Sequence, residues 1–279
     1  MMRPTRWRLI LPRKNDGPMN MAIDEALLSS VGERTQPPTL RFYDWNSVWV
    51  SLGCSQPSSD LAADALRSRG WQVLRRPSGG MAVVHLYQLG YALILPSEDP
   101  CWQGDLASSY ERLSVPLARG FEKLGAMVHL ASPAEKAEFS ANAPPLAGRS
   151  CFGALGPYEV VADGKKLVGN SQVRRRRANL QHGVIQLRGN QSPLVDVIDG
   201  CSEGDLAALR GYLITHVGSV EENAGRPIGI DEAVKAVAMA YADSFGVALE
   251  EGDLAPEECK LAESLVQEKY GQDSWTFRR

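Results

Sequence analysis

Residues 150–172 read SCFGALGPYEVVADGKKLVGNSQ and contain the pattern of a β-hairpin. The dipeptide Asp163-Gly164 favours a type I′ turn between two strands. Cys151 stands just ahead of this hairpin, and Lys165 and Lys166 open its return strand. The stretch therefore predicts two paired strands with a cysteine and two lysines close to one another.

Cys151 is a candidate nucleophile because the hairpin brings a lysine back toward it. A free thiol has a pKa of about 8.5, so roughly a tenth of it is thiolate at physiological pH. Lowering such a pKa to about 7 needs roughly 2 kcal/mol. An ammonium at about 4 Å contributes about 4 kcal/mol at an effective dielectric constant near 20. The alternative interpretation is a buried cysteine that packs as a small apolar residue.

The composition is that of a soluble globular protein, with 44% apolar and 23% charged residues in a chain of 279. A net charge of −3 gives no general attraction to nucleic acid or to an anionic membrane. The five cysteines are widely spread and form no CxxC pair, which argues against disulfides and a structural metal site. No apolar run is long enough for a secretory signal or a membrane span, so we expect a cytoplasmic protein.

The periodicity of apolar residues predicts an α+β fold made of one catalytic domain, residues 1–250, and a C-terminal helix over 251–279 packed on it. We expect strands 39–45 and 47–53 to be neighbours, and residues 132–149 to form an exposed loop. The other expected strands are 71–77, 82–86, 89–95, 126–132, 158–162, 165–173 and 180–187. Helices are expected from the turn at 15–18 through residue 27, over 60–69 and 110–124, from Ser202, from Asp231 to Phe245, and over 256–270. Cys201 and Cys259 stand near helix starts, with no sign of a chemical role.

A second candidate site is the segment RRPSGGMAVVH, residues 75–85. Two glycines after a strand let a ligand approach the backbone closely, or let the backbone adopt positive φ. The flanking residues Arg76, Ser78 and His85 favour a site for an anion or an acyl thioester. The alternative is a plain glycine-rich turn, and the segment matches neither a Walker A loop nor a GxGxxG fingerprint.

Three further features bear on a possible site. Cys54, at the end of a predicted strand, is the rival thiol. The run Arg174–Arg177 is either a solvated turn or a docking patch for an acidic partner protein, because such charges raise association rates. His182 lies in a predicted strand, where a structural role and a catalytic role are equally compatible with the pattern.

Several of these motifs, taken together, resemble the lipoate–protein ligase A/octanoyltransferase superfamily, which has the biotin/lipoate protein ligase fold. The similarity is carried by LRFYDWNSVWVSLGCSQ, RRPSGGMAVVH, DGKKLVGNSQ and LQHGVIQL in this order, together with NMAIDEALL and KYGQDSWTFRR. The chain is most similar to the cysteine-dependent octanoyl-acyl carrier protein:protein N-octanoyltransferase branch. This resemblance implies a mixed β-sheet flanked by helices.

The resemblance also implies an activity in lipoate biosynthesis. Cys151 would carry an octanoyl thioester taken from the phosphopantetheine of acyl carrier protein, with Lys166 favouring the thiolate. The acceptor would be a lysine of a lipoyl-domain protein, either glycine cleavage H protein or the E2 subunit of a 2-oxoacid dehydrogenase, and no bound cofactor or metal is implied. The implied substrate-binding residues are Arg76, Ser78, Gly79, Gly80, His85, Gly169 and His182.

The sequence departs from the family pattern at three positions: Met81 follows the two glycines, Leu86 follows His85, and Gln181 precedes His182. Three alternative functions are also compatible with the sequence. One is an ATP-dependent lipoate–protein ligase, and a second is an amidotransferase between lipoyl-domain proteins. The third is a non-catalytic protein that binds an acyl carrier or a lipoyl domain.

Overall fold

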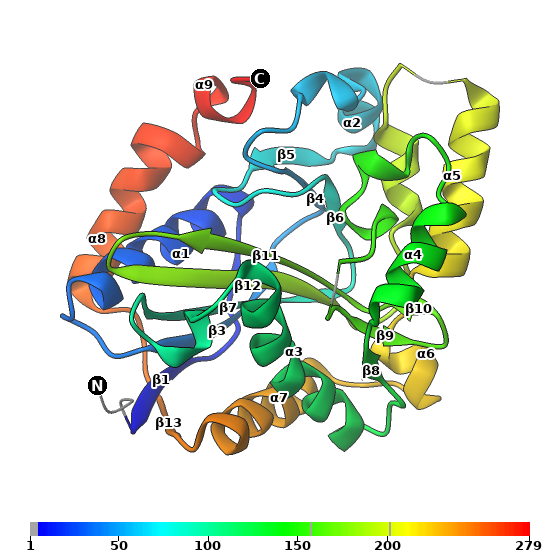
Figure 1. Cartoon of the computed structure of the whole chain (residues 1–279). Helices are drawn as coiled ribbons and strands as arrows, with labels where there is room; N and C mark the ends of the chain where they lie inside the picture. Colours follow the sequence, from blue (N-terminus) through cyan, green and yellow to red (C-terminus); the bar gives the residue numbers. More distant parts are fainter. Residues whose placement is uncertain (1–4, 157, 201) are drawn as a thin grey trace.

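The computed structural model describes residues 5–156, 158–200 and 202–279. Cys201, which we expected near a helix start, lies outside these residues. A central mixed sheet runs through the molecule with helices on both of its faces (Figure 1). The predicted α+β class with a mixed, helix-flanked sheet is confirmed.

The central sheet has the strand order β11-β12-β7-β3-β1-β13, with the short β2 pairing with β3. β1 is parallel to β3 and β13, whereas β7 is antiparallel to β3 and β12. The bounds are β1 Arg6–Ile10, β2 Lys14–Asn15, β3 Thr39–Trp45, β7 Gln88–Pro96, β11 Val168–Arg174, β12 Ala178–Gln186 and β13 Ala248–Glu251.

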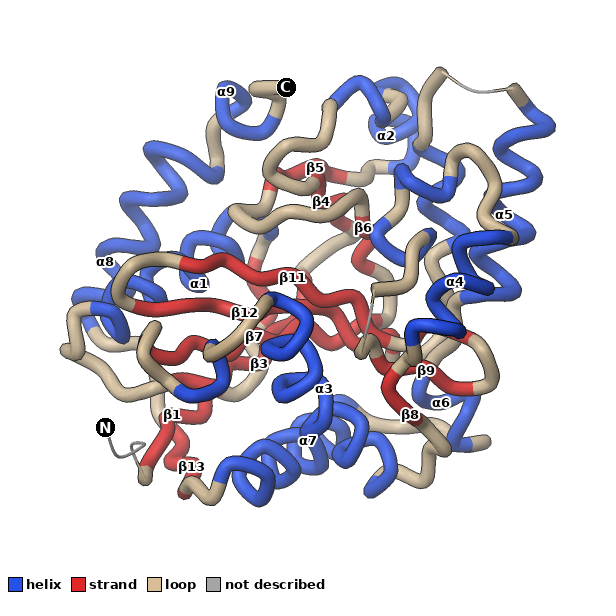
Figure 2. The backbone as a smooth tube through the Cα atoms, in the orientation of Figure 1, coloured by secondary structure: helices blue, strands red, loops and turns tan. Residues whose placement is uncertain are grey.

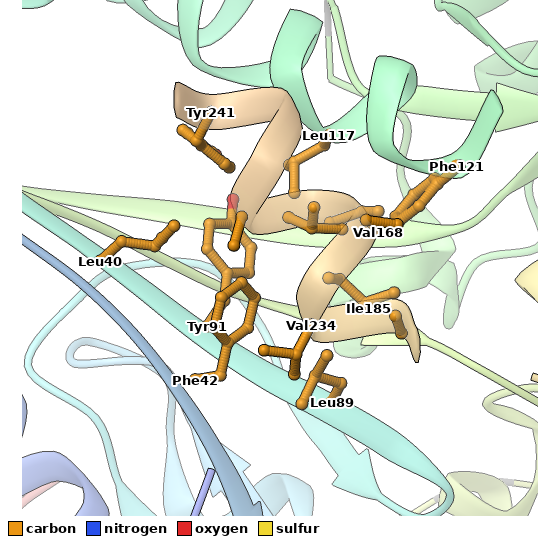
Figure 3. Close-up of a cluster of buried hydrophobic side chains, with 14 of the residues drawn as sticks. Leu40, Phe42, Leu89, Tyr91, Leu117, Phe121, Val168, Ile185, Val234 and Tyr241 are labelled. Carbon is orange, nitrogen blue, oxygen red and sulfur yellow. The ribbon is translucent and has the colours of Figure 1, made fainter. Parts of the chain in front are cut away.

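Helices α3 (Leu106–Lys123) and α7 (Ile230–Phe245) cover one face of this sheet. Leu113, Leu117 and Phe121 follow one another at four-residue spacing, so all three point from α3 into the core. Figure 3 shows Leu117 and Phe121 against strand residues of the central sheet, with Tyr91 and Tyr241 in the same cluster. The opposite face is covered by α1 (Gly17–Gly32) and α8 (Pro256–Leu265).

Two three-stranded sheets lie beside the central one, in the orders β5-β4-β6 and β10-β9-β8 (Figure 2). Their strands are β4 Trp49–Leu52, β5 Gln72–Arg75, β6 Val83–His85, β8 His129–Leu130, β9 Val160–Ala162 and β10 Lys165–Lys166. The remaining helices include α2 Ala63–Arg69, α4 Pro133–Ala141, α5 Glu203–His216, α6 Val220–Ala224 and α9 Asp273–Thr276. The short helical turns are η1 Ser58–Asp60, η2 Pro100–Trp102, η3 Ala147–Arg149, η4 Cys151–Gly153, η5 Ser192–Val197 and η6 Val266–Tyr270.

The prediction that residues 39–45 and 47–53 form neighbouring strands is wrong. Both edges of β3 are occupied, one by β1 and the other by β7. A strand has only two edges for hydrogen bonding, so β4 pairs elsewhere, with β5 and β6. The expected strand 165–173 is likewise divided at Leu167 between two sheets, as β10 and β11.

The prediction that residues 132–149 form an exposed loop is also wrong, because this segment contains α4 and η3. Ser132 and Glu135 form a capping box at the start of α4, and Pro133 occupies the first turn, where its missing N–H costs nothing. Two other helix starts differ from the prediction. α7 is capped by Gly229, with Asp231 in its first turn, and α2 begins at Ala63 rather than at residue 60.

The C-terminal segment packs back onto the first helix. Lys269 and Tyr270 both donate hydrogen bonds to Glu25 of α1, at 2.6 and 2.5 Å. The division of the chain at residue 250 stays a prediction, and it falls inside the edge strand β13. In the described part of the chain, no helix is long and apolar enough to cross a membrane.

Candidate active site

Cys151 begins the short turn η4, where Ser150 caps the turn by accepting a hydrogen bond from the N–H of Phe152. The backbone N–H of Cys151 donates to the carbonyl oxygen of Ala82 at 2.9 Å, next to β6. The side chain is half-buried, while Phe152 beside it is fully buried. The backbone of Cys151 is therefore fixed and its thiol is partly accessible.

Lys166 reaches the backbone of Cys151 across the hairpin. Its Nζ donates to the carbonyl oxygens of Cys151 and Ala154, each at 2.9 Å, and lies 2.8 Å from Oε2 of Glu159. An ammonium has three N–H donors, and these three acceptors occupy all of them. The predicted turn at Asp163-Gly164 is confirmed, since both residues have the positive φ of a type I′ turn.

Two glycines leave room for the sulfur of Cys151. A Cβ added at Gly169 would lie 3.6 Å from Sγ and 2.9 Å from the ring of Phe152. A Cβ added at Gly80 would lie 3.8 Å from Sγ and 2.9 Å from Nη2 of Arg76, and Gly80 also has a φ of 87°. A side chain at either position would push into the space around the thiol.

The thiol lies on the wall of a cavity with an empty volume of about 380 Å³, counting its open mouth. Most of this volume lies in the open mouth, and the enclosed part is about 30 Å³. Its polar lining includes Ser51, Arg76, His85, Ser171 and His182. The apolar lining is Met21, Tyr43, Trp45, Val83 and Val184.

His85 is held as a neutral imidazole with a defined tautomer. The amide N–H groups of Gln88 donate to Val84 and Gln186, so its Oε1 accepts from Nδ1 of His85 at 3.1 Å. Nε2 of His85 then accepts from the hydroxyl of Ser51 at 2.9 Å. Burial, followed by the charge of Arg76, lowers the pKa of His85 to about 3.

A second polar chain connects the SGG loop, residues 78–80, to helix α1. Ser78 donates to Nε2 of His182 at 2.5 Å, and Nδ1 of His182 donates to Asp24 at 2.9 Å. The other carboxylate oxygen of Asp24 accepts from Arg41 at 2.5 Å, and Arg41 also donates to Asn20. All five residues are at least nine-tenths buried, so their hydrogen bonds fix the wall of the cavity.

The residues singled out in the sequence therefore take different positions around one cavity. Arg76, His85, Gly169 and His182 line it together with Cys151. Gly79 and Gly80 belong to the loop whose carbonyls bind Arg76, and Ser78 lies behind His182. The rival thiol, Cys54, is not among the described residues that line the cavity. The run Arg174–Arg177 is exposed at the β11–β12 turn, where its docking role stays a prediction.

The sequence patterns did not indicate the buried acids of the site, Asp24 and Glu159, or the cation Arg41. A signal for Asp24 existed: Asn20 and Asp24 are polar residues four positions apart, on one face of a predicted helix that is otherwise rich in apolar residues. Such residues are rarely buried unless they are paired. Ser51 gave no comparable signal, because alternation in a strand does not identify the partner of a hydroxyl.

The chain belongs to the Lipoyl protein ligase A/B catalytic domain family, which it matches over residues 16–242. It is 36% identical over 274 residues to octanoyltransferase LipM of Kyrpidia tusciae, covering 98% of this chain and 99% of that protein. It is 30% identical over 279 residues to octanoyltransferase LipM of Bacillus subtilis, covering both proteins completely.

Solved structures share the fold. A bipartite lipoate protein ligase from Thermoplasma acidophilum has a TM-score of 0.80 at 22% identity, covering 99% of this chain and 97% of that chain. Lipoate-protein ligase A bound with ATP has a TM-score of 0.76, also at 22% identity, covering 99% of each chain. These likenesses support the expected ligase-type fold, and at this level of identity they do not extend to the reaction.

Proposed function

We propose that this chain is an octanoyltransferase of protein lipoylation that works through a thioester on Cys151. The observation that carries the proposal is a half-buried thiol on the wall of a partly apolar cavity. The chain also aligns over its full length with proteins named octanoyltransferase. A nucleophilic thiol must stay reduced, which fits the reducing conditions of the cytoplasm.

The proposed first step loads the enzyme. The Cys151 thiolate attacks the carbonyl carbon of octanoyl–acyl carrier protein, whose acyl group is carried on phosphopantetheine. A new C–S bond forms, the old C–S bond breaks, and the carrier leaves as a thiolate that takes up a proton. One thioester replaces another, so the step needs neither ATP nor a bound cofactor.

The proposed second step transfers the octanoyl group from the enzyme to the acceptor protein. The neutral ε-amine of a lysine on a lipoyl-domain protein attacks the thioester carbon. A C–N bond forms, the bond to Cys151 breaks, and the sulfur leaves as thiolate while the amine proton passes to solvent. Conversion of a thioester into an amide drives the transfer forward. The acceptors we propose are glycine cleavage H protein and the E2 lipoyl domain.

Lys166 and the cavity have separate roles in this scheme. Lys166 holds the carbonyl of Cys151 and so fixes the backbone that carries the thiol. Apolar side chains such as Met21 and Val184 would face the octanoyl chain. Each methylene removed from water contributes about 0.8 kcal/mol, so a closed slot would select chain length.

The test follows the mass of a purified lipoyl domain after incubation with the enzyme and one of three donors. Octanoyl–acyl carrier protein should add one octanoyl group to the acceptor lysine. Modification only with free lipoate and ATP would identify a ligase instead. Modification only from an octanoylated second lipoyl domain would identify an amidotransferase. Binding of either protein without any mass change would identify a non-catalytic binder.

A further inference from the structure

Arg76 is a buried cation without a carboxylate partner among the described residues. Its side chain is 6% exposed, and its hydrogen bonds go to neutral oxygens. Nη1 donates to the carbonyl and the hydroxyl of Ser51, while Nη2 donates to the carbonyls of Gly79 and Met81, both at 2.8 Å. A buried charge is costly unless an opposite charge compensates it. Burial accordingly lowers the pKa of Arg76, and the charge of Cys151 acts in the opposite direction.

The thiol of Cys151 and the guanidinium of Arg76 face the same space beside Gly80. The position that a Cβ of Gly80 would occupy is 2.9 Å from Nη2 of Arg76 and 3.8 Å from Sγ of Cys151. Both groups also line the same cavity. An anion at the sulfur would therefore lie close to a cation that has no other counter-ion in the described part of the chain.

Lys166, unlike Arg76, has a carboxylate partner. It forms a buried ion pair with Glu159 at 2.8 Å, with side-chain exposures of 2% and 9%. Its remaining two donors bind the backbone carbonyls of Cys151 and Ala154. The pair carries no net charge, so its field at the sulfur is much weaker than that of a lone ammonium.

The other ionisable groups around the sulfur do not supply a free positive charge. His85 is neutral, since burial and Arg76 lower its pKa to about 3. Tyr110 is protonated, because burial, then Glu159 and Cys151, raise its pKa to about 12. His182 is bound by Asp24, whose carboxylate is shared with Arg41.

We propose that Arg76 is the counter-ion of the Cys151 thiolate, and that the Lys166–Glu159 pair serves to hold the backbone that carries the sulfur. The role rests on the proposed function, in which the nucleophile is the thiolate of Cys151. This assignment predicts that removing the charge of Arg76 changes the ionisation of the Cys151 thiol more than removing the Lys166–Glu159 pair does.

The first test measures how fast iodoacetamide alkylates Cys151 in the intact enzyme as a function of pH, by mass spectrometry of the peptide that contains it. In Arg76→Gln the pH of half-maximal rate should rise by about one unit or more, as expected on losing an opposite charge nearby. Arg76→Lys, which keeps the charge, should stay close to the wild type.

The double variant Lys166→Gln/Glu159→Gln, which removes the pair without changing net charge, should shift by less than half as much as Arg76→Gln. A folded Arg76→Gln protein with an unchanged midpoint would overturn the proposal, and so would a larger shift in the double variant.

A second test leaves Arg76 in place, in case its removal unfolds the SGG loop. Cys151→Asp puts a permanent anion near the sulfur position, and Cys151→Asn is its neutral match. The Asp variant should melt at a higher temperature at pH 7, and the difference should persist in the Lys166→Gln/Glu159→Gln background. An Asp variant that melts no higher than the Asn variant contradicts the role of Arg76. Neither test uses an acyl donor, so failure of octanoyl transfer would be recognised separately by the absence of acylation at Cys151.

Discussion

Oε2 of Glu159 lies 2.8 Å from Nζ of Lys166, and both side chains are at least nine-tenths buried. The lysine expected to activate Cys151 is therefore already paired with a carboxylate. Its link to Cys151 is the hydrogen bond to the backbone carbonyl at 2.9 Å. In the part of the chain that the structure describes, no hydrogen bond joins Nζ to the sulfur itself.

This buried pair leads to a prediction about stability. Glu159→Gln leaves the ammonium of Lys166 buried without its counter-ion, so the free energy of unfolding should fall by about 3–5 kcal/mol. The double variant Lys166→Gln/Glu159→Gln should recover much of this loss, because neither charge is then left alone. Urea denaturation of the three proteins measures both values. A single variant as stable as the wild type would show that the pair contributes little to the fold.

Cys151→Ser tests the proposed nucleophile. A serine hydroxyl is scarcely ionised at neutral pH, so octanoyl transfer should fall by about three orders of magnitude. Cys54→Ser is the matched control, because Cys54 is also half-buried but does not line the cavity. It should keep nearly full activity. The rate of transfer to a lipoyl domain is the measurement, and equal losses in the two variants would argue against a specific role for Cys151.

The two adjacent glycines of the SGG loop differ in how well they would tolerate a side chain. Gly80 has a φ of 87°, and a Cβ there would lie 2.9 Å from Arg76, whereas a Cβ on Gly79 would meet nothing within 4 Å. Gly80→Ala should lower the free energy of unfolding by about 1–2 kcal/mol. Gly79→Ala should change it by no more than about 0.5 kcal/mol. Chemical denaturation that gave the same loss for both would contradict the loop geometry.

His85 should remain uncharged across the physiological pH range. Its folded pKa of about 3, set by burial and then by Arg76, is below the unfolded value of about 6.5. Protonation therefore favours the unfolded chain, so the contribution of His85 to stability is present above about pH 6.5. That contribution falls by up to about 1.4 kcal/mol per pH unit as the pH drops toward 3.

Nitrogen NMR of the imidazole ring provides the measurement for His85. The ring should keep the signature of a neutral imidazole protonated at Nδ1 from pH 8 down to pH 5. Urea denaturation over the same range should show a weaker loss of stability in His85→Gln than in the wild type. A ring that titrates near pH 6.5 would rule out the buried, neutral state.

The sequence predicted best those features that depend on neighbours along the chain. The α3 helix followed from apolar residues at three- and four-residue spacing, and the β9–β10 turn followed from Asp163-Gly164. The proximity of Lys166 to Cys151 could be predicted because the hairpin returns the chain toward the cysteine that precedes it. Helix α4 was missed since Ala, Pro and Ser are also common in loops, although the capping pair Ser132 and Glu135 marked its start.

Features that depend on contacts distant in the sequence were not predictable in the same way. Nothing in strand 39–45 indicates that β1 and β7 occupy both of its edges. Asp24 binds His182 over a separation of 158 residues, and Arg41 joins them from a third element. Likewise, Glu159 was visible in the hairpin, but only the folded structure shows that it neutralises Lys166.

Single-turnover mass spectrometry of the enzyme with octanoyl–acyl carrier protein tests the acyl-enzyme most directly. The intact enzyme should gain one octanoyl group, located on the peptide containing Cys151 and removable by hydroxylamine. Adding a lipoyl domain should then move that group to the acceptor lysine as the enzyme returns to its original mass. An octanoylated lipoyl domain formed at full rate while Cys151 never carries an acyl group would contradict the proposed mechanism.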